Sequence, residues 1–413
     1  RTVSSAASDV YKRQRALIRS AARLTYDKVQ AWHEGGMTAG ELELDEAILT
    51  NLFGAWDALG RARAAREPLA LNLKERRVVL DDDGAPAAIV QRAQSESQRL
   101  IEDYMIAANV AAAEALIKAQ RPCVFRVHDQ PDPEKTEGLR DLADAVGTRL
   151  ARGQVLRPHH FNAILAHVRD SADEKMVNEA VLRSQAKAVY SIDNLGHFGL
   201  ALRHYAHFTS PIRRYADLLV HRALVDMLSP GSAPRDGLGG RQAFDLVDDC
   251  TYISETEGRA AAAERRTIDR FAAALFAGEQ GNVVKGVVAG VTGAGAFVSL
   301  GDGAADGFLP ARTLPNDYYT LDKFGMRMAG RHNGMALGIG DAVDVLVVDV
   351  TPVNGGILLS YVDGGGTAKR SGRGKPRKAK AGAGKAKRGA KAKARGKTGA
   401  RGGKKSGKTR RSR

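Results

Sequence analysis

The last fifty residues set the first limit on what this chain of 413 residues can fold into. Residues 364–413 consist almost wholly of Lys, Arg, Gly, Ala and Ser, and they hold 21 of the 63 Lys and Arg residues with no Asp or Glu. So few apolar side chains cannot bury enough surface to offset the entropy lost on ordering. We therefore predict a disordered tail whose charge binds polyanions such as RNA without regard to sequence.

The other 363 residues have the composition of a globular protein. They carry 42 basic and 47 acidic side chains, so a mildly acidic body precedes the basic tail. Over the whole chain the hydrophobic fraction is 43%, which can supply the cores of two or three domains. Cys123 and Cys250 are the only cysteines, which excludes a disulfide scaffold and fits a reducing, cytoplasmic compartment. No apolar run reaches about 18 residues, so we expect no membrane partner.

The first fourteen residues do not share the pattern of the chain that follows. Residue 1 is Arg rather than Met, and residues 4–14 match no element of the body. We interpret residues 1–14 as a non-native leader and exclude them from the fold. We also expect the natural protein to begin further upstream.

Residues 15–276 predict a mixed domain that is mostly helical. Turn residues, caps and apolar periodicity mark its elements. They are strands at 71–80 and 86–92 joined by a turn at 82–84, a helix capped by Ser95 or Ser97 and running to about Lys118, a strand at 123–127, helices at 134–146, 159–168 and 173–189, and a hairpin at 190–202 with its turn at 194–196.

Residues 281–361 change to short alternating strands rich in Gly and Val. The strand-like runs are 283–291, 295–300, 306–310, 342–350 and 357–362. Their number and spacing are typical of a small closed OB-type barrel. The predicted fold class is therefore α+β, with a mixed helix and sheet domain, an all-β OB-fold barrel at 281–361, and a disordered Lys/Arg-rich tail at 364–413.

The segment from residue 204 to residue 224 offers a phosphate site. Thr209 and Ser210 are good N-cap residues and Pro211 suits the first helical position, so Arg213 and Arg214 are expected in the first turn. Guanidinium groups beside free backbone N–H groups bind phosphate. The alternative is that both arginines pair with carboxylates or lie in solvent. The predicted buried stripe of this helix is Ile212, Tyr215, Ala216, Leu219, Val220 and Ala223.

The run HFTSPIRRY, residues 207–215, closely resembles the signature of the RNase II/RNase R family of 3′→5′ exoribonucleases. Further segments resemble the family in the same order, namely 22–30, 99–116, 182–202 and 316–324. The resemblance covers roughly residues 15–361. It implies an RNase II-type catalytic domain at 15–276, incomplete at its N-terminal side, followed by an RNA-binding OB domain. The basic tail is more similar to RNase R than to RNase II.

This resemblance implies processive hydrolysis of single-stranded RNA from its 3′ end to nucleoside 5′-monophosphates. By family position, Arg213 would contact the scissile phosphate and stabilise its developing charge. Tyr26 would lie near the 3′-terminal nucleotide, and its alternative role is to anchor a helix start capped by Thr25 or Asp27. Arg214 and Tyr215 would contact RNA beside Arg213.

Two glutamates complete the catalytic set that the resemblance implies. Glu102 would bind the terminal sugar, with Asp103 as a competing alignment. Glu257 would lie near the terminal nucleotides, with Glu255 as its rival by spacing. The plainer alternatives are that Glu102 is a solvated helix charge and that Glu257 pairs along its own helix surface.

The family's Mg²⁺ is held by an aspartate cluster upstream of the segment that matches residues 22–30, and this sequence has no counterpart. The triple acid at 81–83 lies in a predicted hairpin turn, so we interpret it as turn chemistry. We therefore name no metal ligand, expect the Mg²⁺ ligands upstream of this chain, and expect this chain to bind RNA but hydrolyse it poorly. The alternative function is that of a non-catalytic RNA-binding relative. His197, His204 and His207 lack the further ligands that zinc needs.

In the barrel, Phe297 and Phe308 are candidates for stacking on bases, since OB folds present aromatic side chains in this way. The alternative is that both are core residues, and Phe308 is closer to it because alternation could turn it inward. Lys285 is a candidate phosphate contact, and Arg312 is a candidate RNA contact that could compensate for Pro310, where related barrels often carry a His. We expect single-stranded RNA as the partner and a monomeric protein.

Overall fold

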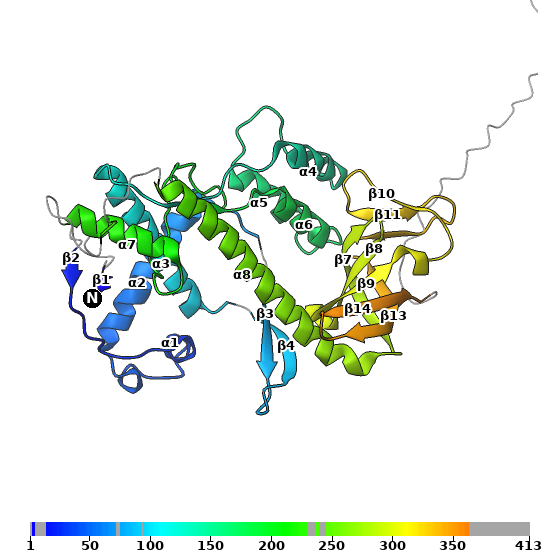
Figure 1. The fold of residues 1–413 in the computed structure, drawn as a ribbon, viewed down its shortest axis with the longest axis horizontal. Helices are drawn as coiled ribbons and strands as arrows, with labels where there is room; N and C mark the ends of the chain where they lie inside the picture. The colour runs from blue at the N-terminus through cyan, green and yellow to red at the C-terminus, as the bar shows by residue number, and fades with distance from the viewer. Residues whose placement is uncertain are drawn as a thin grey trace, which may run out of the picture. The chain divides into compact units, whose positions relative to one another are not determined.

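The computed structural model describes residues 2–4, 14–71, 75–92, 94–228, 237–238 and 245–362 (Figure 1). A helical part runs through the long helix α8 (Asp245–Phe276), and a β-rich part follows it. The predicted α+β fold class is confirmed for these residues, while the predicted basic tail at 364–413 lies outside them. None of the described helices is long and apolar enough to span a membrane. Of the predicted leader, β1 (Thr2–Ser4) is described and pairs with β2 (Gln14–Ala16).

Three helices open the body. They are α1 (Tyr26–His33), α2 (Glu46–Arg66) and α3 (Glu96–Lys118). Ser95 caps α3 in a capping box with Gln98, as one of the two predicted caps required. Val29, Phe53 and Leu100 bury one side chain from each helix in a shared cluster, which fixes the start of α3 against α1.

The hairpin and the three middle helices appear close to their predicted positions. They are β3 (Glu75–Leu80), β4 (Pro86–Arg92), α4 (Pro133–Ala145), α5 (Pro158–His167) and α6 (Glu174–Ser184). Helix α6 ends five residues earlier than predicted. Its last turn is buried, and the Ser184 hydroxyl and the Gln185 side chain both donate to the Val181 carbonyl.

The predicted hairpin at 190–202 is wrong. β6 (Val189–Ser191) instead pairs antiparallel with β5 (Phe125–Val127), which lies more than sixty residues away in the sequence. The turn at 194–196 exists, but only isolated bridges at His197 follow it. β5 supplies a buried apolar partner, and local turn chemistry could not reveal that long-range pairing.

The helix after the signature begins later than predicted. α7 (Tyr215–Leu228) starts four residues after Pro211, and residues 211–213 form a turn in front of it. The Ser210 carbonyl accepts from the backbone N–H groups of both Arg213 and Arg214, which closes this turn. Ile212 is therefore fully exposed rather than part of the buried stripe, and Tyr215 is also exposed. Ala216, Leu219, Val220 and Ala223 are buried as predicted.

The predicted barrel is confirmed. Its strands are β7 (Val283–Thr292), β8 (Gly295–Leu300), β9 (Ala305–Pro310), β13 (Ala342–Thr351) and β14 (Gly356–Tyr361), and they close in the order β13-β14-β9-β8-β7. Ala272 and Ala273 of α8 belong to the same buried cluster as the barrel interior. A separate sheet contains β10 (Tyr319–Leu321), β11 (Arg327–Gly330) and β12 (Ala336–Gly338). Short 3₁₀ turns lie at Gly40–Leu42, Ala277–Glu279, Gly301–Gly303 and Ala311–Thr313.

Candidate nucleic-acid site

The signature loop, residues 204–214, leads into α7. Side chains of α3 and of α7 itself hold its backbone. Asn109 of α3 accepts from the Phe208 backbone N–H at 2.8 Å, and its amide donates to the Tyr205 hydroxyl at 3.2 Å. From the other side, His221 of α7 hydrogen-bonds the Phe208 carbonyl at 2.8 Å and stacks on the Phe208 ring with centroids 4.3 Å apart. The loop is thus fixed at neighbouring residues before the turn that carries the arginines.

Asp217 separates the roles of the two signature arginines. Its side chain is fully buried, and its Oδ1 accepts from the Ser210 backbone N–H at 2.7 Å and from the Arg214 guanidinium at 2.8 Å. Arg214 is therefore turned inward, and Arg213 remains the exposed guanidinium of the pair. The predicted contact of Arg214 with RNA stays a prediction, and its present partner gives it a structural role.

Arg126 of β5 is a third arginine beside this loop. Arg126 makes a two-point ion pair with Glu257 of α8, at 2.7 and 3.0 Å. The Arg126 guanidinium also lies over the ring of Tyr190, 4.7 Å from its centroid. The Tyr190 hydroxyl in turn hydrogen-bonds His207 Nδ1 at 2.9 Å. These contacts join β5, β6, α8 and the signature loop. We refer to Arg126, Arg213 and Arg214 as the arginine cluster.

Charged groups of β5, α3 and the signature loop shift the pKa values of Tyr205 and His207. Burial raises the pKa of the Tyr205 hydroxyl, while the Asn109 hydrogen bond and the nearby charges of Arg214 and Arg126 lower it and Glu102 raises it. Burial, followed by Arg214, Arg126, His197 and Arg213, lowers the pKa of His207 to about 3. His207 is thus neutral at physiological pH, and the positive charge of the cluster comes from its arginines.

The structure distinguishes between the competing acidic residues. Asp103 is buried, and its carboxylate accepts from the Trp56 indole at 2.9 Å and pairs with Arg63 at 3.0 Å. Glu102 is exposed and meets only Gln94 among the described residues, at 2.8 Å. Asp103 therefore joins α2 to α3, whereas Glu102 has a carboxylate available to a ligand, and its sugar-binding role stays a prediction.

Glu257 and its rival Glu255 also differ in their surroundings. Glu257 faces the arginine cluster and pairs with Arg126, so the pairing along its own helix that we considered is wrong. Glu255 is exposed to solvent two residues earlier on α8. The contact of Glu257 with terminal nucleotides stays a prediction.

Tyr26 lies at the first position of α1, apart from the arginine cluster in its contacts. Thr25 caps the helix, as one alternative required, by accepting from the Lys28 backbone N–H at 3.4 Å. The Tyr26 carbonyl accepts from Ser97 Oγ at 3.0 Å, which fixes it beside the start of α3, on which Glu102 also lies. Tyr26 is 45% exposed, and its role near the 3′-terminal nucleotide stays a prediction.

The side chains in the described residues do not fit the Mg²⁺ that the resemblance implies. Nowhere in those ranges do three His, Cys, Asp or Glu side chains come together to hold a metal ion. The acids at 81–83 act as turn residues, because Asp81 Oδ1 accepts from the backbone N–H groups of Asp83 and Ala85 at 3.1 and 2.8 Å. His204 Nδ1 lies 2.7 Å from the Asn194 amide, and no group of three metal-binding side chains forms around it within the described ranges.

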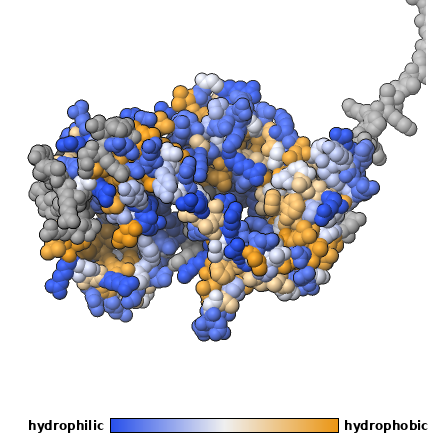
Figure 2. Space-filling model, in the orientation of Figure 1, coloured by the Kyte–Doolittle hydropathy of each residue, from blue (hydrophilic) through white to orange (hydrophobic). Residues whose placement is uncertain are grey.

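The barrel carries an aromatic pair on its outer surface. The rings of Phe297 and Phe308 lie 5.3 Å apart, and both line a cavity of about 500 Å³ together with Arg265 of α8 and Arg76 of β3. Phe308 is half-buried and does not point into the barrel core, so the inward orientation that alternation allowed is not found. Figure 2 shows hydrophobic residues gathered over the barrel. Lys285 and Arg312 are exposed, and the RNA contacts of all four residues stay predictions.

Sequence reasoning missed Arg126, Asp217, Tyr190, Tyr205 and Asn109. Two of them had a signal. Arg126 is the one charged residue in the apolar run CVFRV, and Asp217 is the one acid on the buried face of α7. A charge in such a place requires a partner, so both positions indicated a buried ion pair. The others are ordinary in the sequence and gain their role only from tertiary contacts.

Comparisons with known proteins agree with this architecture. Residues 5–230 match the RNB domain and residues 278–361 match the S1 RNA binding domain. Ribonuclease R of Escherichia coli (strain K12) is 34% identical over 383 residues, covering 90% of this chain and 46% of that protein. Ribonuclease R of Aquifex aeolicus (strain VF5) is 34% identical over 350 residues, 83% of this chain and 48% of the relative. This chain thus spans about half the length of these relatives.

Solved structures of RNase R are also similar to this chain. The apo form of Mycoplasma genitalium RNase R superposes with a TM-score of 0.74 at 25% identity, covering 82% of this chain and 53% of that one. The same values hold for that enzyme in complex with ribose methylated single-stranded RNA. The fold and the site define a protein with an RNB domain followed by an S1 RNA-binding domain. Within that class, this chain belongs to the RNase R family.

Proposed function

We propose that this chain holds the 3′ end of single-stranded RNA at the signature loop, and that the protein hydrolyses RNA processively from that end to nucleoside 5′-monophosphates. The observation that carries the proposal is the fixed signature loop, held by Asn109 and His221, in which Asp217 turns Arg214 inward and leaves Arg213 exposed. Support comes from the RNase R of Mycoplasma genitalium, which is similar in structure and was solved with single-stranded RNA. We also propose that it acts as a monomer in the cytoplasm.

The exposed side chains of Arg213, Glu102 and Tyr26 can each take a different role in binding RNA. Arg213 is exposed beside a turn whose backbone is held rigidly, so its guanidinium can meet a phosphate and neutralise charge that grows during hydrolysis. The exposed carboxylate of Glu102 can accept hydrogen bonds from the ribose hydroxyls, which DNA lacks in part. Tyr26 can stack on the terminal base. A divalent cation, with Mg²⁺ as our proposal, would supply an activated water, and the described residues contribute no ligands to it.

A second candidate function is RNA binding without hydrolysis. The described ranges offer no cluster of metal-binding side chains, and this fold also occurs in yeast Ssd1, which is described as a pseudonuclease. That likeness has a TM-score of 0.53 at 16% identity, and it therefore concerns the fold alone. Both candidates bind RNA, so only the products of a reaction can separate them.

The test uses protein expressed from the whole reading frame, Mg²⁺, and a single-stranded RNA labelled at its 5′ end. We expect stepwise shortening of the labelled strand and release of nucleoside 5′-monophosphates, because hydrolysis starts at the 3′ end. A matched RNA blocked by a 3′-phosphate is the control and should shorten more slowly. RNA binding with no shortening would favour the non-catalytic relative. Internal fragments without mononucleotides would contradict the proposal.

A further inference from the structure

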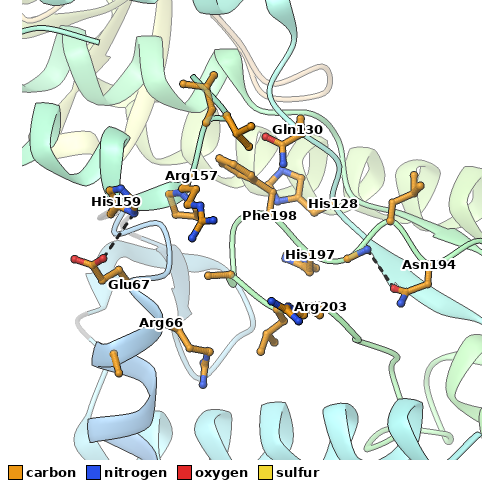
Figure 3. Close-up of a pocket in the computed structure, with 18 residues that line it drawn as sticks. Arg66, Glu67, His128, Gln130, Arg157, His159, Asn194, His197, Phe198 and Arg203 are labelled. Atoms are coloured by element: carbon orange, nitrogen blue, oxygen red, sulfur yellow. Dashed lines mark hydrogen bonds and ion pairs between the residues drawn. The ribbon is translucent and has the colours of Figure 1, made fainter. Parts of the chain in front are cut away.

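A cavity of about 610 Å³ lies behind the signature loop (Figure 3). Its walls come from the end of α2, the residues after β5, the N-terminus of α5 and the segment at 194–203. His128 and Phe198 are buried at 9% and 7% exposure and make its floor. Val155 and Leu195 are strongly exposed apolar side chains in the same lining. The lining thus mixes polar and apolar side chains, and the volume lies within the range of about 300–1,000 Å³ common for small-ligand sites.

Three guanidinium groups give this cavity a positive charge. Arg66, Arg157 and Arg203 all line it, and Figure 3 shows their side chains around one shared space. Neither Arg157 nor Arg203 pairs with a carboxylate among the described residues, and Arg66 Nε is buried there without a hydrogen-bond partner. The one carboxylate in the lining is Glu67, which is exposed and lies 3.7 Å from His159. Arg157 and Arg203 are exposed to solvent, so a bound anion would replace water at these two groups, and at the half-buried Arg66 it would give Nε an acceptor.

The N-terminus of α5 adds to this field. Arg157 is its N-cap, Pro158 its first residue, and no acidic side chain lies in the first turn. A cation at the positive end of a helix dipole is unfavourable by itself, and a bound anion would be attracted both to the helix N-terminus and to the Arg157 guanidinium. Burial lowers the pKa of His197 to about 3 and lowers that of His128. These rings are neutral, so the charge of the cavity comes from its guanidinium groups.

The cavity shares a wall with the candidate RNA site. The His197 ring lies 5.3 Å from the Tyr205 ring, and Tyr205 lies 5.6 Å from the ring of His207 on its other side. One layer of aromatic side chains therefore separates the cavity from the arginine cluster of the signature loop.

We propose that this cavity binds one nucleoside 5′-monophosphate, with the phosphate between Arg157 and Arg203 and the base against the apolar wall. The inference rests on the proposed function, because that reaction would produce such a ligand next to the cavity. The volume exceeds the needs of inorganic phosphate and can accommodate one nucleotide. The site is distinct from the signature loop, since none of its lining residues belongs to residues 204–224.

Isothermal titration calorimetry of the chain with adenosine 5′-monophosphate tests the inference. We expect binding to the unchanged chain, weaker binding of inorganic phosphate, and no binding of adenosine. Arg157→Ala and Arg203→Ala should each weaken the nucleotide by about tenfold, since each removes a charged hydrogen bond. Arg157→Lys should recover part of that loss by keeping the charge. Arg169→Ala is the matched control, because Arg169 is exposed and lies outside the cavity.

Single-stranded RNA is titrated into the same preparations so that the two proposals fail separately. RNA binding with no nucleotide binding would overturn the cavity assignment and leave the proposed function standing. Nucleotide binding that is lost in Arg213→Ala and kept in Arg157→Ala would also overturn it, since the ligand would then occupy the signature loop. If the chain binds the nucleotide through Arg157 and Arg203 but does not bind RNA, the result would support the cavity assignment and contradict the proposed function.

Discussion

Replacing Asp217 with alanine is expected to lower the free energy of unfolding of the RNB domain by about 3–5 kcal/mol. The carboxylate is fully buried and is the ion-pair partner of Arg214, whose side chain is only 20% exposed. Its removal leaves a guanidinium in the interior without a partner, and the Ser210 backbone N–H also loses its acceptor. Asp217→Asn keeps an acceptor for Ser210 but loses the charge, so we expect a smaller loss.

Urea unfolding followed by tryptophan fluorescence measures this loss in the right domain. The two tryptophans of the chain, Trp32 and Trp56, lie in α1 and α2 and report on the helical part rather than the barrel. Asp144→Ala, at an exposed position of α4, is the matched control and should change the free energy of unfolding by no more than about 0.5 kcal/mol. Equal small changes in both variants would mean that the buried pair does not hold the loop.

Arg213→Ala is expected to reduce kcat for RNA hydrolysis by about 10²–10³-fold in protein expressed from the whole reading frame. The Kd for single-stranded RNA should change only by a few-fold, because one phosphate contact is a small part of the binding but meets the charge that develops during hydrolysis. The fold should be unaffected, since this exposed side chain makes no ion pair with the described residues.

Single-turnover rates and equilibrium binding, measured on the same RNA, separate the two effects. Arg149→Ala removes an exposed arginine of the loop after α4 and controls for the loss of one positive charge. Arg213→Lys keeps that charge without the two-pronged geometry and should recover only part of the rate. Equal losses of rate and of affinity in Arg213→Ala would reject its role in the reaction.

Local sequence signals predicted the parts of the fold that local interactions determine. Ser95 and Gln98 indicated the start of α3, and the acids at 81–83 indicated a turn. Alternating Val residues predicted the barrel strands. The pairing of β5 with β6 could not be predicted in this way, because it depends on contacts between distant segments. Helix α7 starts late because the buried Asp217 engages Ser210, which a cap rule does not foresee.

The candidate site shows the same division. The signature run and family position pointed to Arg213, Glu102 and Glu257, and of these the structure joins Glu257 to Arg126, whose guanidinium lies over the Tyr190 ring. The sequence did not indicate that Arg214 turns inward to Asp217, or that Arg126 crosses from β5 to Glu257. Such pairs join residues that are unremarkable where they stand in the chain, so they become visible only in three dimensions.

The central claim is that the signature loop grips the 3′ end of an RNA strand. Photocrosslinking tests it most directly, with 4-thiouridine as the 3′-terminal nucleotide and mass spectrometry to identify the attached peptides. We predict crosslinks to peptides that contain Tyr26, Arg213 or Glu257, and none to them when the same label is at the 5′ end of a long strand. Crosslinks from the 3′-terminal label that fall only on the barrel, around Phe297 and Phe308, would contradict the claim.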